Sequence, residues 1–188
     1  MTDHLWNTIF HPHLAMRQLA DEKPWGSGLI LYLGAVSFMM IINQGTLALK
    51  PIEAFPWQHM WLLGLTGIIF SLLILLVSAG FFSLFSEIIY KRGNSLGLLT
   101  ALSFAILPGL LGTVLNYGFV IMGMAWLGAI FSSLGVIWVL ILQIMAIRAA
   151  MDLRTSQALL LYFTPLLIIT FITVLFIAFA LLSSLALL

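Results

Sequence analysis

The sequence contains very little charge. Only 7% of its 188 residues are Asp, Glu, Lys or Arg, whereas a soluble domain carries about a quarter. Four runs have no charged residue at all, namely 24–49, 54–86, 93–147 and 155–188. A soluble domain of roughly 150 residues buries only about 70% of its surface, so it could not hide this much apolar chain. The composition predicts a polytopic membrane protein and excludes disorder, a soluble enzyme and a nucleic-acid binder.

Cysteine is absent. This excludes disulfides, thiolate metal sites, cysteine nucleophiles and cysteine-linked lipids. The formal net charge of +1 is too small for a nucleic-acid footprint. No cleavable signal peptide is evident, so we expect the first hydrophobic segment to act as an uncleaved anchor.

The hydrophobic runs predict five transmembrane helices. A helix crosses the ~30 Å hydrocarbon core with about 20 residues. The run 93–147 would be about 80 Å long as a single helix, so it must fold back, and Asn116, Gly118 and Gly123 suit a break. We therefore expect an all-α five-helix bundle in residues 26–188, with spans near 26–49, 61–90, 95–116, 124–147 and 158–182.

Residues 1–25 form a short N-terminal segment that is predicted to be an amphipathic interfacial helix, with Pro12 able to open a helical turn. We expect it to cover the end of the bundle, and a docking surface for a cytoplasmic partner is the alternative. Exposed histidines in a short tail seldom bind metal, so we expect no metal site at His4, His11 or His13.

Orientation follows from the positive charges. With five spans, one side holds six of the seven Lys and Arg residues, and the other holds only Lys50. The positive-inside rule then predicts a cytoplasmic N-terminus and an exterior C-terminus. The bacterial cytoplasmic (inner) membrane is the expected location.

A few polar residues in or near the spans are candidates for a functional site. Asn43, Gln44, His59 and Asn116 are expected at similar depth on the outer side. They could line a small outward-facing cavity, or they could form hydrogen bonds that join helices. The first interpretation would favour a small transporter or channel.

Charged residues are expected only at the inner boundary. Glu87 precedes Lys91 by one helical turn, and Arg148 precedes Asp152 in the same way. This spacing predicts two ion pairs at the inner interface. Glu87 could instead relay a proton or cation, but its place beside Lys91 favours pairing.

Two prolines lie inside predicted spans, Pro108 in the third and Pro165 in the fifth. Each removes a backbone hydrogen bond and is expected to bend its helix. Small residues at four-residue spacing predict close approach between the third and fourth spans. The sequence lacks H-E-x-x-H, G-x-S-x-G and Walker motifs, so we expect neither an enzyme nor a bound cofactor or metal.

The order of several short motifs is typical of a known family. They read His11-Pro12-His13-Leu14 and Asp21-Glu22-Lys23-Pro24-Trp25 in the tail, Tyr90-Lys91-Arg92-Gly93 after the second span, Leu102-Ser103-Phe104-Ala105-Ile106-Leu107-Pro108 in the third, and Ile147-Arg148-Ala149-Ala150-Met151 after the fourth. The chain resembles the Yip-domain family of Ypt/Rab-interacting-protein-like, five-span membrane proteins, in its bacterial form. The resemblance covers nearly the whole chain and implies a five-helix bundle with a cytoplasmic N-terminus.

The resemblance also bounds the function. Eukaryotic relatives associate with Rab-type GTPases, and they have a longer cytoplasmic region with an Asp-Leu-Tyr-Gly-Pro motif. This chain has neither the longer region nor the motif, so GTPase binding is not carried over. The expected function is a non-enzymatic organiser or adaptor for lipids or other membrane proteins. The expected partners are the lipid bilayer, other membrane proteins or a second copy of the chain.

Overall fold

The computed structural model describes residues 6–8, 10–48 and 60–186. All regular structure in these residues is helical. The elements are α2 (Pro12–Glu22), α3 (Trp25–Ala48), α4 (Met60–Tyr90), α5 (Ser95–Phe104), α6 (Leu107–Ile121), α7 (Ala125–Ala150) and α8 (Thr155–Ala186). Five helical stretches of this part of the chain are long and apolar enough to cross a membrane. The predicted all-α polytopic fold is therefore confirmed.

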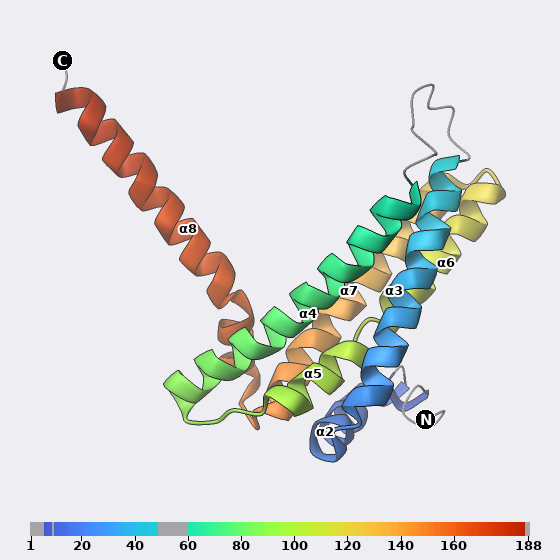
Figure 1. The fold of residues 1–188 in the computed structure, drawn as a ribbon, viewed down its shortest axis with the longest axis horizontal. Coiled ribbons are helices and arrows are strands. Elements are labelled where there is room, and N and C mark those ends of the chain that lie inside the picture. Colours follow the sequence, from blue (N-terminus) through green and yellow to red (C-terminus); the bar gives the residue numbers. More distant parts are fainter. Residues whose placement is uncertain (1–5, 9, 49–59, 187–188) are drawn as a thin grey trace.

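The core of the bundle forms around α5. Helices α2, α3, α4 and α7 all contact it (Figure 1), and every residue from Gly97 to Phe104 is buried. The short helix α2 lies across one end of the bundle and contacts α5 and α7. Its buried face consists of Ala15, Met16, Leu19 and Ala20, so its apolar side packs on protein and covers the end of the bundle.

The third span is broken into α5 and α6. Pro108 lies in the first turn of α6, and Ala105 and Ile106 form the turn between the two helices. A proline at this position has no N–H to donate to the carbonyl four residues earlier, at Phe104. The helix therefore stops and restarts. Helix α6 then continues to Ile121, beyond the end predicted at residue 116, and the chain reverses at Gly123, whose φ is +76°.

Glycines let α6 and α7 approach each other closely. A Cβ on Gly135 would lie 2.9 Å from the Pro108 carbonyl oxygen and 3.2 Å from the Gly112 Cα. A Cβ on Gly128 would lie 2.9 Å from the Asn116 carbonyl oxygen. The backbones meet directly here, as small residues allow in membrane helices. The contact uses Gly112, Gly128 and Gly135, and it joins the two spans for which small residues predicted a close approach.

Three helices end in the same unusual way at one end of the molecule. Lys23 follows α2, Lys91 follows α4 and Asp152 follows α7, with φ values of 50°, 59° and 49°. These are left-handed conformations, which glycine usually adopts after a helix. The Lys23 N–H donates to the Leu19 carbonyl, and the Lys91 N–H donates to the Glu87 carbonyl, both at 3.1 Å. Each residue therefore closes its helix at some cost in backbone strain.

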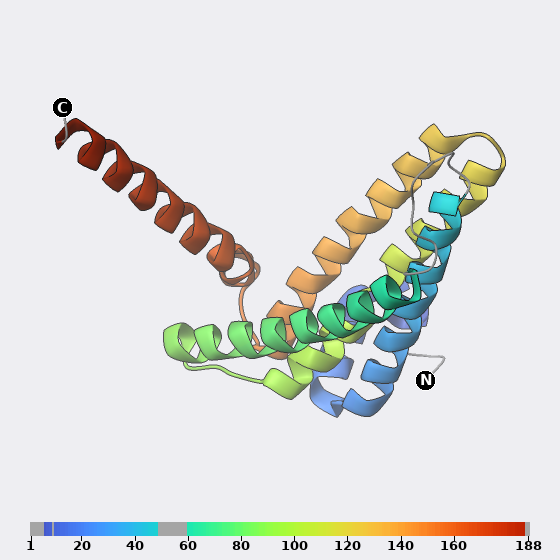
Figure 2. The ribbon, with the colours of Figure 1, turned by 45° about the horizontal axis from the view of Figure 1, so that its top comes forward.

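Helix α8 leaves the bundle. Its beginning is anchored by Ala158 and Leu161, which are fully buried, but its further part points away from the other helices (Figure 1). The turned view in Figure 2 shows the same separation. Only 6% of its most apolar stretch is buried, compared with 61% for the span formed by α5 and α6. Helix α8 and the bundle thus form a V, and Pro165 lies inside the bent helix.

Candidate functional site

The polar residues that were expected on the outer side lie at different helix contacts. The Gln44 side chain faces α4, where its Nε2 would be 3.2 Å from a Cβ on Gly64. The Asn116 side chain faces α7, where its Oδ1 would be 2.5 Å from a Cβ on Gly128. Asn43 is exposed on α3, and His59 lies outside the described residues. Gln44 and Asn116 are therefore directed toward two separate neighbours.

At the opposite end, Asp152 pairs with a residue distant in sequence. Its Oδ2 lies 3.1 Å from Nη1 of Arg92, and the same Nη1 also donates to the Asp152 backbone carbonyl. This pair joins the turn after α4 to the turn after α7. Arg148, the residue that the helical spacing favoured as a partner of Asp152, instead borders a pocket beneath α2.

Glu87 folds over the turn that follows its own helix. Its Oε2 would lie 3.2 Å from a Cβ on Gly93, so the carboxylate is close to the backbone there. Lys91 serves through its backbone, since it is the left-handed residue that ends α4. No ion pair between Glu87 and Lys91 is found among the described residues, and Lys91 instead has a helix-ending role that the spacing did not indicate.

A cavity of about 510 Å³ lies at the base of the V. Five helices line it: Tyr32 comes from α3, Phe82 from α4, Leu102 from α5, Gln143 from α7, and Tyr162 and Pro165 from α8. Most of its lining side chains are apolar. Pro165, which was predicted only as a bend, thus borders a cavity between α8 and the bundle.

One polar contact joins the two arms of the V. The Tyr162 hydroxyl of α8 donates to Oε1 of Gln143 on α7 at 2.8 Å. The Tyr162 ring also stacks on Phe82 of α4, with ring centroids 6.0 Å apart. Spacing along the sequence does not predict this contact, because residues 143 and 162 lie on different spans.

Several serine and threonine hydroxyls in the spans donate to carbonyls of their own helices. Thr100 donates to the Leu96 carbonyl at 2.9 Å, and Ser103 donates to the Leu99 carbonyl at 2.8 Å. Thr113 of α6 does the same with Gly109. Such back-bonding satisfies a polar group where lipid offers no partner. These hydroxyls are therefore already satisfied within the helices.

In residues 6–8, 10–48 and 60–186, no three histidine or acidic side chains lie close enough together to hold a metal ion. The polar features of the described region include the Gln143–Tyr162 contact between spans and a set of charged groups at one end. That end carries Arg17, Arg92, Arg148, Asp152 and Arg154.

Comparison with known proteins gives one match. A family model described as the Yip1 domain matches residues 6–183, which is nearly the whole chain. No curated protein and no solved structure matches significantly.

Proposed function

Because the chain belongs to the Yip1 domain family, we propose that this integral membrane protein is a non-enzymatic organiser that acts on lipids or on other membrane proteins. The observation that carries the proposal is the V between α8 and the bundle, with an apolar cavity of about 510 Å³ at its base. Apolar walls with a few polar groups are suited to holding a hydrophobic partner.

The side chains of the cavity support binding rather than chemistry. The Tyr162 hydroxyl donates to Oε1 of Gln143, and the Tyr32 hydroxyl donates to the Ser71 carbonyl at 3.2 Å. Transport is not proposed, because Gln44 and Asn116, on which a polar pathway would depend, face different helices.

Site-specific photocrosslinking tests the organiser function. The chain has no cysteine, so a single cysteine can carry a benzophenone label. We would place it at Ser78, which lines the cavity, and as a matched control at Ile30, whose side chain is 71% exposed on α3. Products formed in native membranes would be identified by mass spectrometry.

A defined lipid or membrane protein that is enriched at Ser78→Cys over Ile30→Cys is the expected result. The same mixture of bulk lipids at both positions would contradict the proposal, because the cavity would then differ in no way from the rest of the lipid-facing surface.

The proposed orientation has a cytoplasmic N-terminus and an exterior C-terminus, in a bacterial inner membrane. It is supported by the positive charges, since Arg17, Lys91 and Arg154 all belong to the end that holds α2 and the turns after α4 and α7 (Figure 1). The positive-inside rule assigns that end to the cytoplasm.

Cysteine accessibility tests this orientation. Met122→Cys lies in the turn between α6 and α7, and Gln18→Cys lies on the exposed face of α2. A membrane-impermeant maleimide should label Met122→Cys in intact cells and Gln18→Cys only after permeabilisation. The reverse pattern would overturn the assignment.

A further inference from the structure

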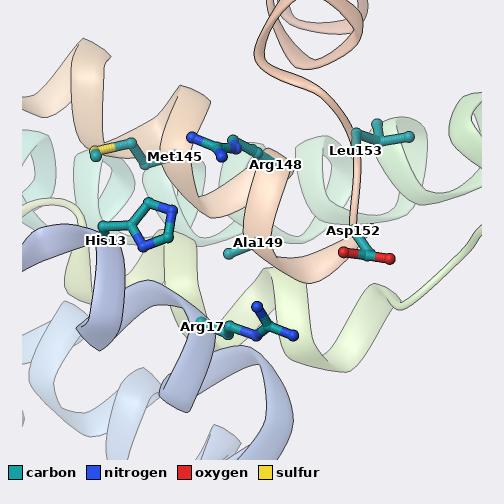
Figure 3. A pocket seen from close by; sticks show the side chains of 7 residues that line it. All are labelled: His13, Arg17, Met145, Arg148, Ala149, Asp152 and Leu153. Carbon is teal, nitrogen blue, oxygen red and sulfur yellow. The ribbon is translucent and has the colours of Figure 1, made fainter.

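A second pocket lies at the other face of α7, beneath α2. It has a volume of about 110 Å³ and is bordered by His13 and Arg17 of α2, by Met145, Arg148 and Ala149 of α7, and by Asp152 and Leu153, which follow α7. Figure 3 shows the side chains of His13, Arg17 and Arg148 grouped around it. The minimum for one water is about 10–15 Å³ by the same kind of measure, so the pocket has room for a small polar group.

The pocket carries excess positive charge. Neither Arg17 nor Arg148 forms an ion pair or a side-chain hydrogen bond within the part of the chain that the structure describes. The one carboxylate among the lining residues, that of Asp152, is paired with Arg92 at 3.1 Å. Two guanidinium groups and an imidazole therefore remain to donate hydrogen bonds, and arginine forks match the geometry of phosphate oxygens.

The backbone at this place opposes an anion less than an uncapped helix end would. The end of α7 would normally present bare carbonyl oxygens. Here the Met151 and Leu153 N–H groups donate to the carbonyls of Ile147 and Arg148, at 3.1 Å and 3.0 Å. The negative end of the helix is thus capped, and Arg148 in its last turn offsets what remains of its dipole.

The depth of the pocket identifies the source of the anion. Helix α7 is long enough to span the membrane, and Arg148 lies in its last turn, so the pocket lies where lipid headgroups begin. Basic pockets between helices at this level suit anionic headgroups. We propose that Arg17 and Arg148, with His13 beside them, bind the phosphate group of an anionic phospholipid.

This site is independent of the cavity in the V. Gln143 faces α8, whereas Arg148 faces α2, and at 100° per residue the two side chains lie on opposite sides of α7. The site would serve to hold α2 against the membrane surface through a lipid that touches both helices. Loss of one site leaves the other intact, so the two proposals fail separately.

The test measures lipid retention by the full-length chain. The protein would be purified from nanodiscs that contain equal amounts of phosphatidylcholine and phosphatidylglycerol, and retained lipids would be counted by native mass spectrometry. Arg17→Gln and Arg148→Gln are the test variants. Arg154→Gln is the matched control, because Arg154 is exposed at the same end, outside this pocket.

We expect the wild type to retain phosphatidylglycerol in preference to phosphatidylcholine. Each test variant should retain it about tenfold less, since a charge-assisted hydrogen bond contributes on the order of this factor. Arg154→Gln should behave as the wild type, and Arg148→Lys should retain an intermediate amount, which separates loss of the site from misfolding.

Three results would overturn the proposal. One is an equal loss in Arg154→Gln, which would show that only the general charge of the surface matters. Another is equal retention of both lipids by the wild type. The third combines two measurements: inorganic phosphate alone raises the melting temperature of the wild type but not of Arg148→Gln, and Arg148→Gln retains as much lipid as the wild type. The ligand would then be a soluble phosphate.

Discussion

Asn94 ties the N-terminal helix to the centre of the bundle through the backbone of Ala20. Its Nδ2 donates to the Ala20 carbonyl at 3.3 Å, while its Oδ1 accepts from the Gly97 N–H at 3.1 Å. One side chain therefore caps the start of α5 and bonds the end of α2. Gly97 permits the approach, because a Cβ there would lie 2.5 Å from the Ala20 carbonyl oxygen.

Asn94→Ala should destabilise the protein by about 1–2 kcal/mol, because it removes a helix cap and the bond to α2. Asn94→Asp keeps the capping oxygen but cannot donate to Ala20. We expect it to preserve bundle stability in a denaturant titration, but to increase proteolytic cleavage around α2. Equal stability of Asn94→Ala and the wild type would contradict the capping role.

Gly135→Ala should destabilise the contact between α6 and α7. The new methyl group would meet backbone at Pro108 and Gly112, which cannot move aside as a flexible side chain could. Such overpacking typically costs about 1–3 kcal/mol. Gly118→Ala on α6 is the matched control, because nothing lies within 4 Å of that position. Unfolding in mixed micelles should show a loss for the first variant only.

Lys91→Gly should stabilise the protein by about 1 kcal/mol. The left-handed conformation of Lys91, with φ of 59°, costs an L-residue roughly 1–2 kcal/mol, and glycine avoids that cost. Lys91→Ala removes the same charge but keeps the Cβ. A gain in thermal stability for glycine without one for alanine is the expected result, and equal effects would assign the change to charge instead.

Tyr162→Phe should cost about 0.6 kcal/mol, the mean value of an interhelical hydrogen bond in a membrane. The hydroxyl bond to Gln143 is lost, while the ring stacking on Phe82 remains. A double-mutant cycle with Gln143→Leu measures the coupling between the two side chains. If the two substitutions prove fully additive, the contact does not stabilise the attachment of α8.

The sequence predicts most of the fold, since apolar length and charge spacing act locally along the chain. The five spans and the all-helical class follow from these features, and Pro108 predicts a bend in the third span, where the structure has a break between α5 and α6. The sequence did not predict that α6 continues to Ile121. Asn116 and Gly118 favour a turn by composition, but close packing against Gly128 accommodates Asn116 inside the helix.

The contacts between distant residues could not be predicted in the same way. The pairs Arg92–Asp152 and Gln143–Tyr162 join different helices or turns, so they depend on how the spans pack. Helical spacing favoured Arg148 as the partner of Asp152 because only the local chain was considered. The pocket shared by Arg17 and Arg148 likewise exists only once α2 has folded across the bundle.

Helix α8 packs against the other helices near its start, but most of its remaining described length has no protein around it and is exposed to the surroundings of the bundle. A segment held at a single point takes its slope from the thickness of the hydrocarbon layer around it, because an apolar stretch longer than that layer tilts to match it. The angle between α8 and the other helices should therefore depend on the thickness of the surrounding bilayer. A thinner bilayer would increase this angle.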